Sequence, residues 1–240
     1  MVGSAPLRGL GSLAGLLVGI TFLDELATGV PFAGTPEVRG EFGVGYGAAA
    51  GWLLAAAGAL ALVLEPPLFL LADRRPRRPF VVSGLVGVAA ACFLGALAPT
   101  YAWLFVALLL YGPASGAACG VAQATLMDAN PTERERWMVR WTLAGELGDL
   151  LAPGLVWASV ALGGSYRLAF GAAGALFLVQ AVRVARRPFP ARAAPVEERE
   201  TRFAARLRSA LATPGLWPWA FATLACTLMD EIVVAFGALY

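Results

Sequence analysis

Residues 21–26 read Thr-Phe-Leu-Asp-Glu-Leu, an acidic pair inside a long apolar segment, and residues 227–232 read Thr-Leu-Met-Asp-Glu-Ile in a second one. The two pairs, Asp24-Glu25 and Asp230-Glu231, lie 206 positions apart. Carboxylates are costly in oily surroundings, so those found inside membrane spans usually serve a function. Their recurrence at one offset predicts a duplicated functional helix, as in membrane proteins built from internal repeats.

The composition predicts an integral membrane protein. Of the 240 residues, 59% are hydrophobic and 14% are charged, and the mean hydropathy is +0.70. This exceeds what a soluble domain of this length needs for its core. The membrane is expected to be the bacterial inner (cytoplasmic) membrane, because the exclusive use of arginine over lysine and the abundance of alanine, glycine and leucine suggest a GC-rich bacterial genome.

The missing residue types exclude several chemistries. The sequence contains neither lysine nor histidine, so it offers no Schiff-base lysine, no His-Glu-x-x-His zinc site and no histidine base for a serine triad. Cys92, Cys119 and Cys226 fall in apolar runs at unrelated spacings, which indicates neither a disulfide framework nor a metal site. We therefore expect no enzyme activity, no catalytic residue, no cofactor, no metal and no nucleic-acid partner.

The arginines predict the orientation. Sixteen of them gather at alternate ends of the apolar segments, and only Arg39 and Arg167 fall at the opposite ends. By the positive-inside rule the amino terminus is cytoplasmic and the chain crosses the membrane an odd number of times. A cleaved signal peptide is the alternative for the first segment, but an acidic pair is unusual there and no small-residue cleavage site stands out.

Seven segments are long enough to span a bilayer, which takes about 20 apolar residues. The predicted helices are Leu10–Phe32, Tyr46–Ala72, Phe80–Ala98, Tyr101–Met127, Met138–Leu162, Tyr166–Val184 and Leu216–Tyr240. The segment 33–45 is expected to be an external loop. We place the domains at 1–184 (six-helix bundle), 185–213 (cytoplasmic connector with a short amphipathic helix) and 214–240 (first helix of a second bundle).

Residues 69–78 read Phe-Leu-Leu-Ala-Asp-Arg-Arg-Pro-Arg-Arg and resemble the Gly-x-x-x-Asp-Arg-x-Gly-Arg-Arg signature of the major facilitator superfamily. Phe69 and Pro76 replace the two glycines. The resemblance covers nearly the full chain and implies an all-α membrane fold, namely one six-helix half-bundle plus a seventh helix of a truncated 12-helix fold. It also implies a conformational latch of the outward-facing state, formed by Asp73, Arg74, Arg77, Arg78 and, at the inner end of the fourth helix, Asp128.

Seven carboxylates are predicted inside the spans, where no arginine is expected at the same depth. Glu65 lies near the inner end of the second span and is expected to be structural, so the candidate coupling and substrate residues are the other six: Asp24, Glu25, Glu146, Asp149, Asp230 and Glu231. Such groups take up protons or attract cations. Neighbouring helical residues point about 100° apart, so one of Asp24 and Glu25 lines a cavity and the other meets a neighbouring helix; Asp24 and Asp230 are our choice for the cavity. The alternative is structural, with hydrogen bonds to Thr21 and Thr227 that fix helix pairing.

The sequence thus predicts a secondary active transporter that moves a small organic molecule by alternating access, coupled to protons. Efflux of cationic or amphipathic compounds is favoured over uptake of a metabolite. Its expected partners are the substrate, protons, the lipid bilayer and a carboxy-terminal half-bundle missing from this chain. The alternatives are a seven-span receptor-like or structural membrane protein, and a non-functional truncated fragment of a transporter.

Overall fold

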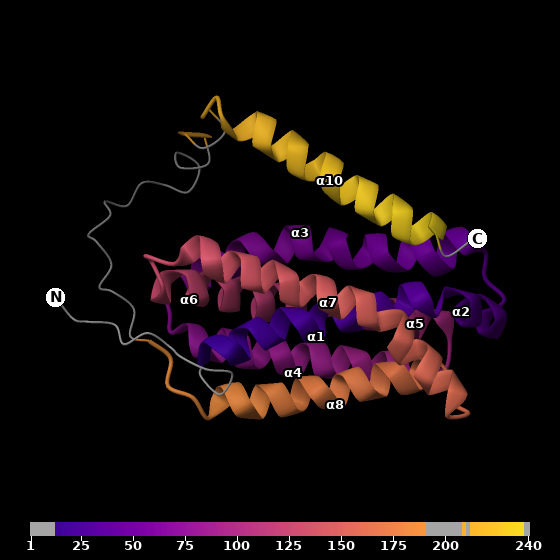
Figure 1. Ribbon diagram of the computed structural model, residues 1–240. Coiled ribbons are helices and arrows are strands. Elements are labelled where there is room, and N and C mark those ends of the chain that lie inside the picture. The colour runs from indigo at the N-terminus through magenta and orange to yellow at the C-terminus, as the bar shows by residue number, and fades with distance from the viewer. Residues whose placement is uncertain (1–12, 191–207, 210–211, 238–240) are drawn as a thin grey trace. The chain divides into compact units, whose positions relative to one another are not determined.

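A computed structural model of the chain describes residues 13–190, 208–209 and 212–237, and their regular structure is helical (Figure 1). The elements in chain order are α1 (Leu13–Ala33), α2 (Thr35–Phe42), the π-helical turn η1 (Gly47–Trp52), α3 (Leu53–Ala72), α4 (Arg77–Ala96), α5 (Tyr101–Ser115), the π-helical turn η2 (Gly116–Gly120), α6 (Val121–Ala129), α7 (Arg134–Ala161), α8 (Tyr166–Ala185) and α10 (Leu216–Gly237). The all-α class is therefore confirmed.

The chain divides into two compact units, Met1–Pro190 and Ala191–Tyr240. In the first unit α1 packs mainly on α7 and α8, α4 lies between α5 and α8, and α3 packs on α5. Figure 1 shows these long helices running side by side. The second unit contributes α10 to the described residues. Most of the connector, where the short amphipathic helix is expected, lies outside the described residues.

Each predicted span corresponds to helical structure, and within the described residues four helical segments are long and apolar enough to cross a membrane: Leu13–Ala33, Arg77–Ala96, Tyr101–Ala129 and Tyr166–Ala185. Shorter apolar stretches occupy Gly58–Ala72 and Leu216–Cys226. The fifth predicted span lies in the 28-residue α7, which also carries charged side chains. These apolar helices make the chain a multi-pass membrane protein.

One local expectation is wrong. The segment 33–45, expected to be a loop, contains the helix α2. Pro36 lies in the first turn of α2, where its missing N–H has no helical partner to lose. The helix ends at Gly43, whose φ of 63° is a left-handed conformation that glycine adopts without strain.

Glycines let α1 and α7 approach closely. A Cβ atom placed on Gly148 of α7 would collide with the carbonyl oxygen of Phe22 and lie 2.9 Å from the amide nitrogen of Leu26. At Gly145, one turn earlier, a Cβ would lie 3.3 Å from both Glu25 Cγ and Thr21 Oγ1. The two helix backbones are therefore in direct contact along the stretch that carries the acidic pair.

Two glycines of the fourth span also have a packing role. Gly116 faces the side chain of Glu65, and Gly120 faces the ring of Phe69, one turn further along α3. Phe69, which replaces a signature glycine, therefore packs on a glycine of its own bundle.

Arg167, at the start of α8, joins three segments at one end of the bundle. Its guanidinium and Nε donate to Glu41 of α2, with Nε 3.1 Å from Oε1. Nη1 donates to the Ala96 carbonyl at 2.9 Å, and Nη2 donates to the Ala98 carbonyl at 2.6 Å. The hydrogen bond from Arg167 holds the pKa of Glu41 below its ordinary value of 4.5.

We expect Glu41→Gln to lower the thermal midpoint of unfolding by about 2 °C at neutral pH, because the exposed pair contributes up to about 1 kcal/mol. A carboxyl group whose pKa is lowered by folding stabilises the protein above its unfolded pKa and loses this effect as pH falls through the folded pKa. The difference between wild type and variant should therefore be full above about pH 4.5 and vanish at lower pH. Thermal midpoints measured across pH test this, with Glu135→Gln as the control. A difference in thermal midpoint that persists unchanged at pH 3 contradicts the ion pair of Glu41 with Arg167.

Candidate functional site

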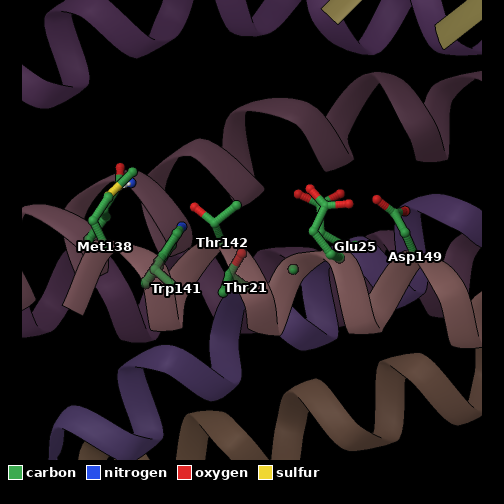
Figure 2. A pocket seen from close by; sticks show the side chains of 9 residues that line it. Thr21, Glu25, Met138, Trp141, Thr142 and Asp149 are labelled. Atoms are coloured by element: carbon green, nitrogen blue, oxygen red, sulfur yellow. Dashed lines mark hydrogen bonds between the residues drawn. The ribbon is translucent and has the colours of Figure 1, made fainter. Parts of the chain in front are cut away.

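A pocket of about 220 Å³ lies where α1, α6 and α7 meet. Nine residues line it: Thr21, Glu25, Gln123, Met138, Trp141, Thr142, Gly145, Glu146 and Asp149. Figure 2 shows Met138 at one end and Asp149 at the other, with Glu25 beside Asp149. The pocket thus combines three carboxylates with an indole ring and a thioether.

The close contact of α1 with α7 positions these carboxylates. Glu25 packs against Gly145 and Gly148. Asp149 Oδ1 lies 3.8 Å from the place that a Cβ on Gly29 would occupy, so Asp149 also lies beside α1. Glu146 lines the same pocket and is exposed. The structure therefore brings together Glu25, Glu146 and Asp149, three of the residues expected from the sequence.

Asp24 points to a different neighbour. Its Oδ1 accepts a hydrogen bond from the Tyr111 hydroxyl and its Oδ2 one from the Ser115 hydroxyl, both at 2.8 Å. The Tyr111 hydroxyl also lies 3.0 Å from the backbone oxygen of Asp24, and Thr28 donates to that oxygen at 2.8 Å. Asp24 is thus part of a polar cluster between α1 and α5. The geometry reverses our assignment within the pair, since Glu25 lines the pocket and Asp24 meets a neighbouring helix.

A second carboxylate, Glu65 of α3, lies next to this cluster. Its Oε1 is in the space above Gly116, the residue after Ser115. Cys119, in the same π-helical turn, is also close to the Asp24 carboxyl group. One turn of the fourth span therefore contacts acidic side chains from both α1 and α3.

The partners of Asp24 are residues that the sequence did not single out. Tyr111 and Ser115 are four positions apart and so lie on one helix face, but this pattern is common in membrane helices. The expected partner Thr21 lines the pocket with Glu25 instead. Asp230 and Glu231 belong to α10, and their side chains lie outside what the structure describes.

An ion-pair network joins the start of α4 to the end of α6. Arg77 Nη1 lies 2.8 Å from Asp128 Oδ2, and Arg77 Nη2 lies 3.4 Å from Asp73 Oδ1. Arg134 also reaches Asp128, at 3.8 Å. Of the other signature residues, Arg78 donates instead to the Ala185 carbonyl of α8, and Arg74 is exposed.

Within the described residues, no group of three or more histidine, cysteine, aspartate or glutamate side chains is arranged to hold a metal ion. The site offers hydrogen-bond acceptors, negative charge and one aromatic face. These groups are suited to binding a cation and to accepting protons.

The comparisons with known proteins agree with the helical fold and the signature. A search among curated proteins finds no significant match. The model of the family described as Major Facilitator Superfamily matches residues 17–240, which is nearly the whole chain. Members of this family are membrane transporters of small molecules rather than enzymes. This chain, with its apolar helices and a signature loop whose charges pair across helix ends, belongs to the major facilitator superfamily.

Proposed function

We propose that this protein exports a small organic cation across a bacterial cytoplasmic membrane, driven by protons, with its amino terminus in the cytoplasm. The observation that carries the proposal is the pocket in which Glu25, Glu146 and Asp149 share a wall with Trp141. A second half-bundle, to which α10 would belong, would complete the cavity in this scheme. The pocket would then be one side of the substrate path.

The pocket chemistry favours a cation with an apolar body. Carboxylates attract positive charge most strongly where water is scarce. An indole face attracts cations through its π-electrons, and the thioether of Met138 adapts to irregular apolar shapes. A neutral sugar would gain nothing from the negative charge of these carboxylates, whereas an amphipathic cation matches both the charged and the apolar parts of the lining.

Proton coupling is assigned to Asp24. The hydroxyl groups of Tyr111 and Ser115 can each donate or accept, so they can serve Asp24 in its charged and its protonated form. A carboxyl group that gains and loses a proton as access alternates couples proton movement to substrate movement. Substrate binding at Glu25 and proton binding at Asp24 would thus occupy adjacent residues on different sides of α1.

The ion pairs of Arg77 with Asp73 and Asp128 are our candidate for the latch of the outward-facing state. They hold the inner ends of α4 and α6 together within this bundle. In the proposed cycle, opening towards the cytoplasm weakens this network. Arg134 adds a second cation to Asp128.

The substrate proposal is tested with the full-length protein in inside-out membrane vesicles and tetraphenylphosphonium as the probe cation. We expect Glu25→Gln to reduce uptake into these vesicles at least about tenfold, the effect of losing one interaction of roughly 1.4 kcal/mol. The control variant is Glu133→Gln, which removes an equal charge from the exposed loop before α7. Equal transport by wild type and Glu25→Gln contradicts the cation site, and accumulation only in right-side-out vesicles contradicts export.

A further inference from the structure

Four arginines form what we call the basic patch: Arg78 on α4, and Arg183, Arg186 and Arg187 at the end of α8. Arg78 donates to the backbone carbonyl of Ala185, so the first turn of α4 touches the last turn of α8. The two helices pack along their lengths, as Figure 1 shows. All four arginines are exposed. The contact therefore gathers four positive charges at one end of the bundle.

The helices that carry the patch provide no negative charge. The sequence has no aspartate or glutamate between Arg74 and Met127, and none between Leu150 and Val196. Among the described residues, the arginines in ion pairs are Arg77, Arg134, Arg136 and Arg167. The structured surroundings thus leave the patch strongly positive.

The outer face of α8 is apolar up to the patch. Val179 and Val182 are 56% and 48% exposed, and they precede Arg183 and Arg186 on the same face, at helical spacings of three and four residues. Four residues of helix rise about 6 Å. A molecule along this face would therefore meet hydrocarbon first and guanidinium groups directly after it.

We propose that the basic patch binds the headgroup of an anionic phospholipid whose acyl chains lie along the exposed valines of α8. Guanidinium groups donate paired hydrogen bonds to phosphate oxygens, so they bind such a headgroup with better-defined geometry than an ammonium group does. Basic pockets between the ends of membrane helices suit lipids with net negative charge. The apolar face beside the arginines selects a lipid over a soluble anion.

Native mass spectrometry of the full-length protein, with phosphatidylglycerol and phosphatidylcholine added in equal amounts, tests the proposal. We expect wild type to retain phosphatidylglycerol preferentially. Arg183→Gln/Arg186→Gln should reduce that preference about tenfold or more, since each arginine near the membrane surface contributes about 1 kcal/mol. The matched control is Arg136→Gln/Arg140→Gln, which removes two exposed arginines from α7. Arg183→Lys/Arg186→Lys keeps the charge and should retain most of the preference.

Three results overturn the proposal. If the two glutamine variants lose the preference equally, the effect comes from diffuse charge and not from a site. Equal retention of the two lipids by wild type shows that headgroup charge is not recognised. Displacement of bound phosphatidylglycerol by millimolar inorganic phosphate shows a site for free anions, to which the acyl chains contribute nothing. None of these readouts depends on transport.

Discussion

Replacing Gly148 with alanine is expected to destabilise the bundle by about 3 kcal/mol or more, at the upper end of the range for overpacking. The added Cβ would collide with the backbone of Phe22 and press against the backbone of Leu26. Neither neighbour is a flexible side chain that can swing away, so α1 and α7 must separate along their contact. This moves Glu25 relative to α7 and opens the pocket. Thermal unfolding in detergent measures the loss of stability.

Gly154 provides the matched control on the same helix. A Cβ there meets nothing within 4 Å, and alanine has the higher helix propensity by about 1 kcal/mol. Gly154→Ala should therefore leave the thermal midpoint unchanged or raise it slightly. If both variants lose stability equally, the effect comes from the helix backbone and the proposed close contact is not its cause.

Asp24→Asn combined with Asp230→Asn is expected to abolish transport driven by a pH gradient in the full-length protein. Asparagine keeps the shape of the side chain and can still hydrogen-bond with Tyr111 and Ser115, but it cannot take up and release a proton. Facilitated exchange of substrate without a gradient should persist, because it needs no proton. The measurement is substrate flux in proteoliposomes with and without an imposed pH difference.

The structural alternative for Asp24 makes the opposite prediction. If its hydrogen bonds only fix the pairing of α1 with α5, Tyr111→Phe should impair the protein as much as the double asparagine variant does, through lost stability. We expect Tyr111→Phe to lower the thermal midpoint while gradient-driven flux per folded molecule remains measurable. Unchanged gradient-driven flux in the double asparagine variant rules out the coupling role.

The helices were predictable from the sequence because membrane spans need long apolar segments, and their ends carry clear signals. Pro76 stands immediately before α4, and Ser165 caps α8 by accepting from the Arg167 amide at 3.2 Å. The helix α2 was missed because only eight residues form it and its apolar content is low. We interpreted Pro36 and Gly43 as loop residues, but they mark the start and the end of this short helix.

The site was predictable only in part, because helix periodicity gives relative directions and not the identity of neighbours. The 100° rule correctly separated Asp24 from Glu25, but nothing in α1 alone shows which of its sides faces α7. Gly145 and Gly148 determine this, because they let α7 approach one side of α1 closely. Their spacing of three residues is visible in the sequence, but the sequence does not show which helix packs against them. Tyr111 and Ser115 became recognisable as functional candidates only through their contact with Asp24.

The π-helical turn η2, Gly116–Gly120, couples two distant contacts of the fourth span. A π-helical turn holds one residue more than an α-helical turn, and one residue corresponds to about 100° of rotation. Before this turn Ser115 faces Asp24 inside the bundle, and after it Asp128 faces Arg77 at one end of the bundle. The additional residue therefore sets the rotation of α6 relative to α5 within one span. With this rotation, the same span serves both an interior polar cluster and a surface ion pair. A regular α-helix of the same sequence would point one of these two groups of side chains away from its partners.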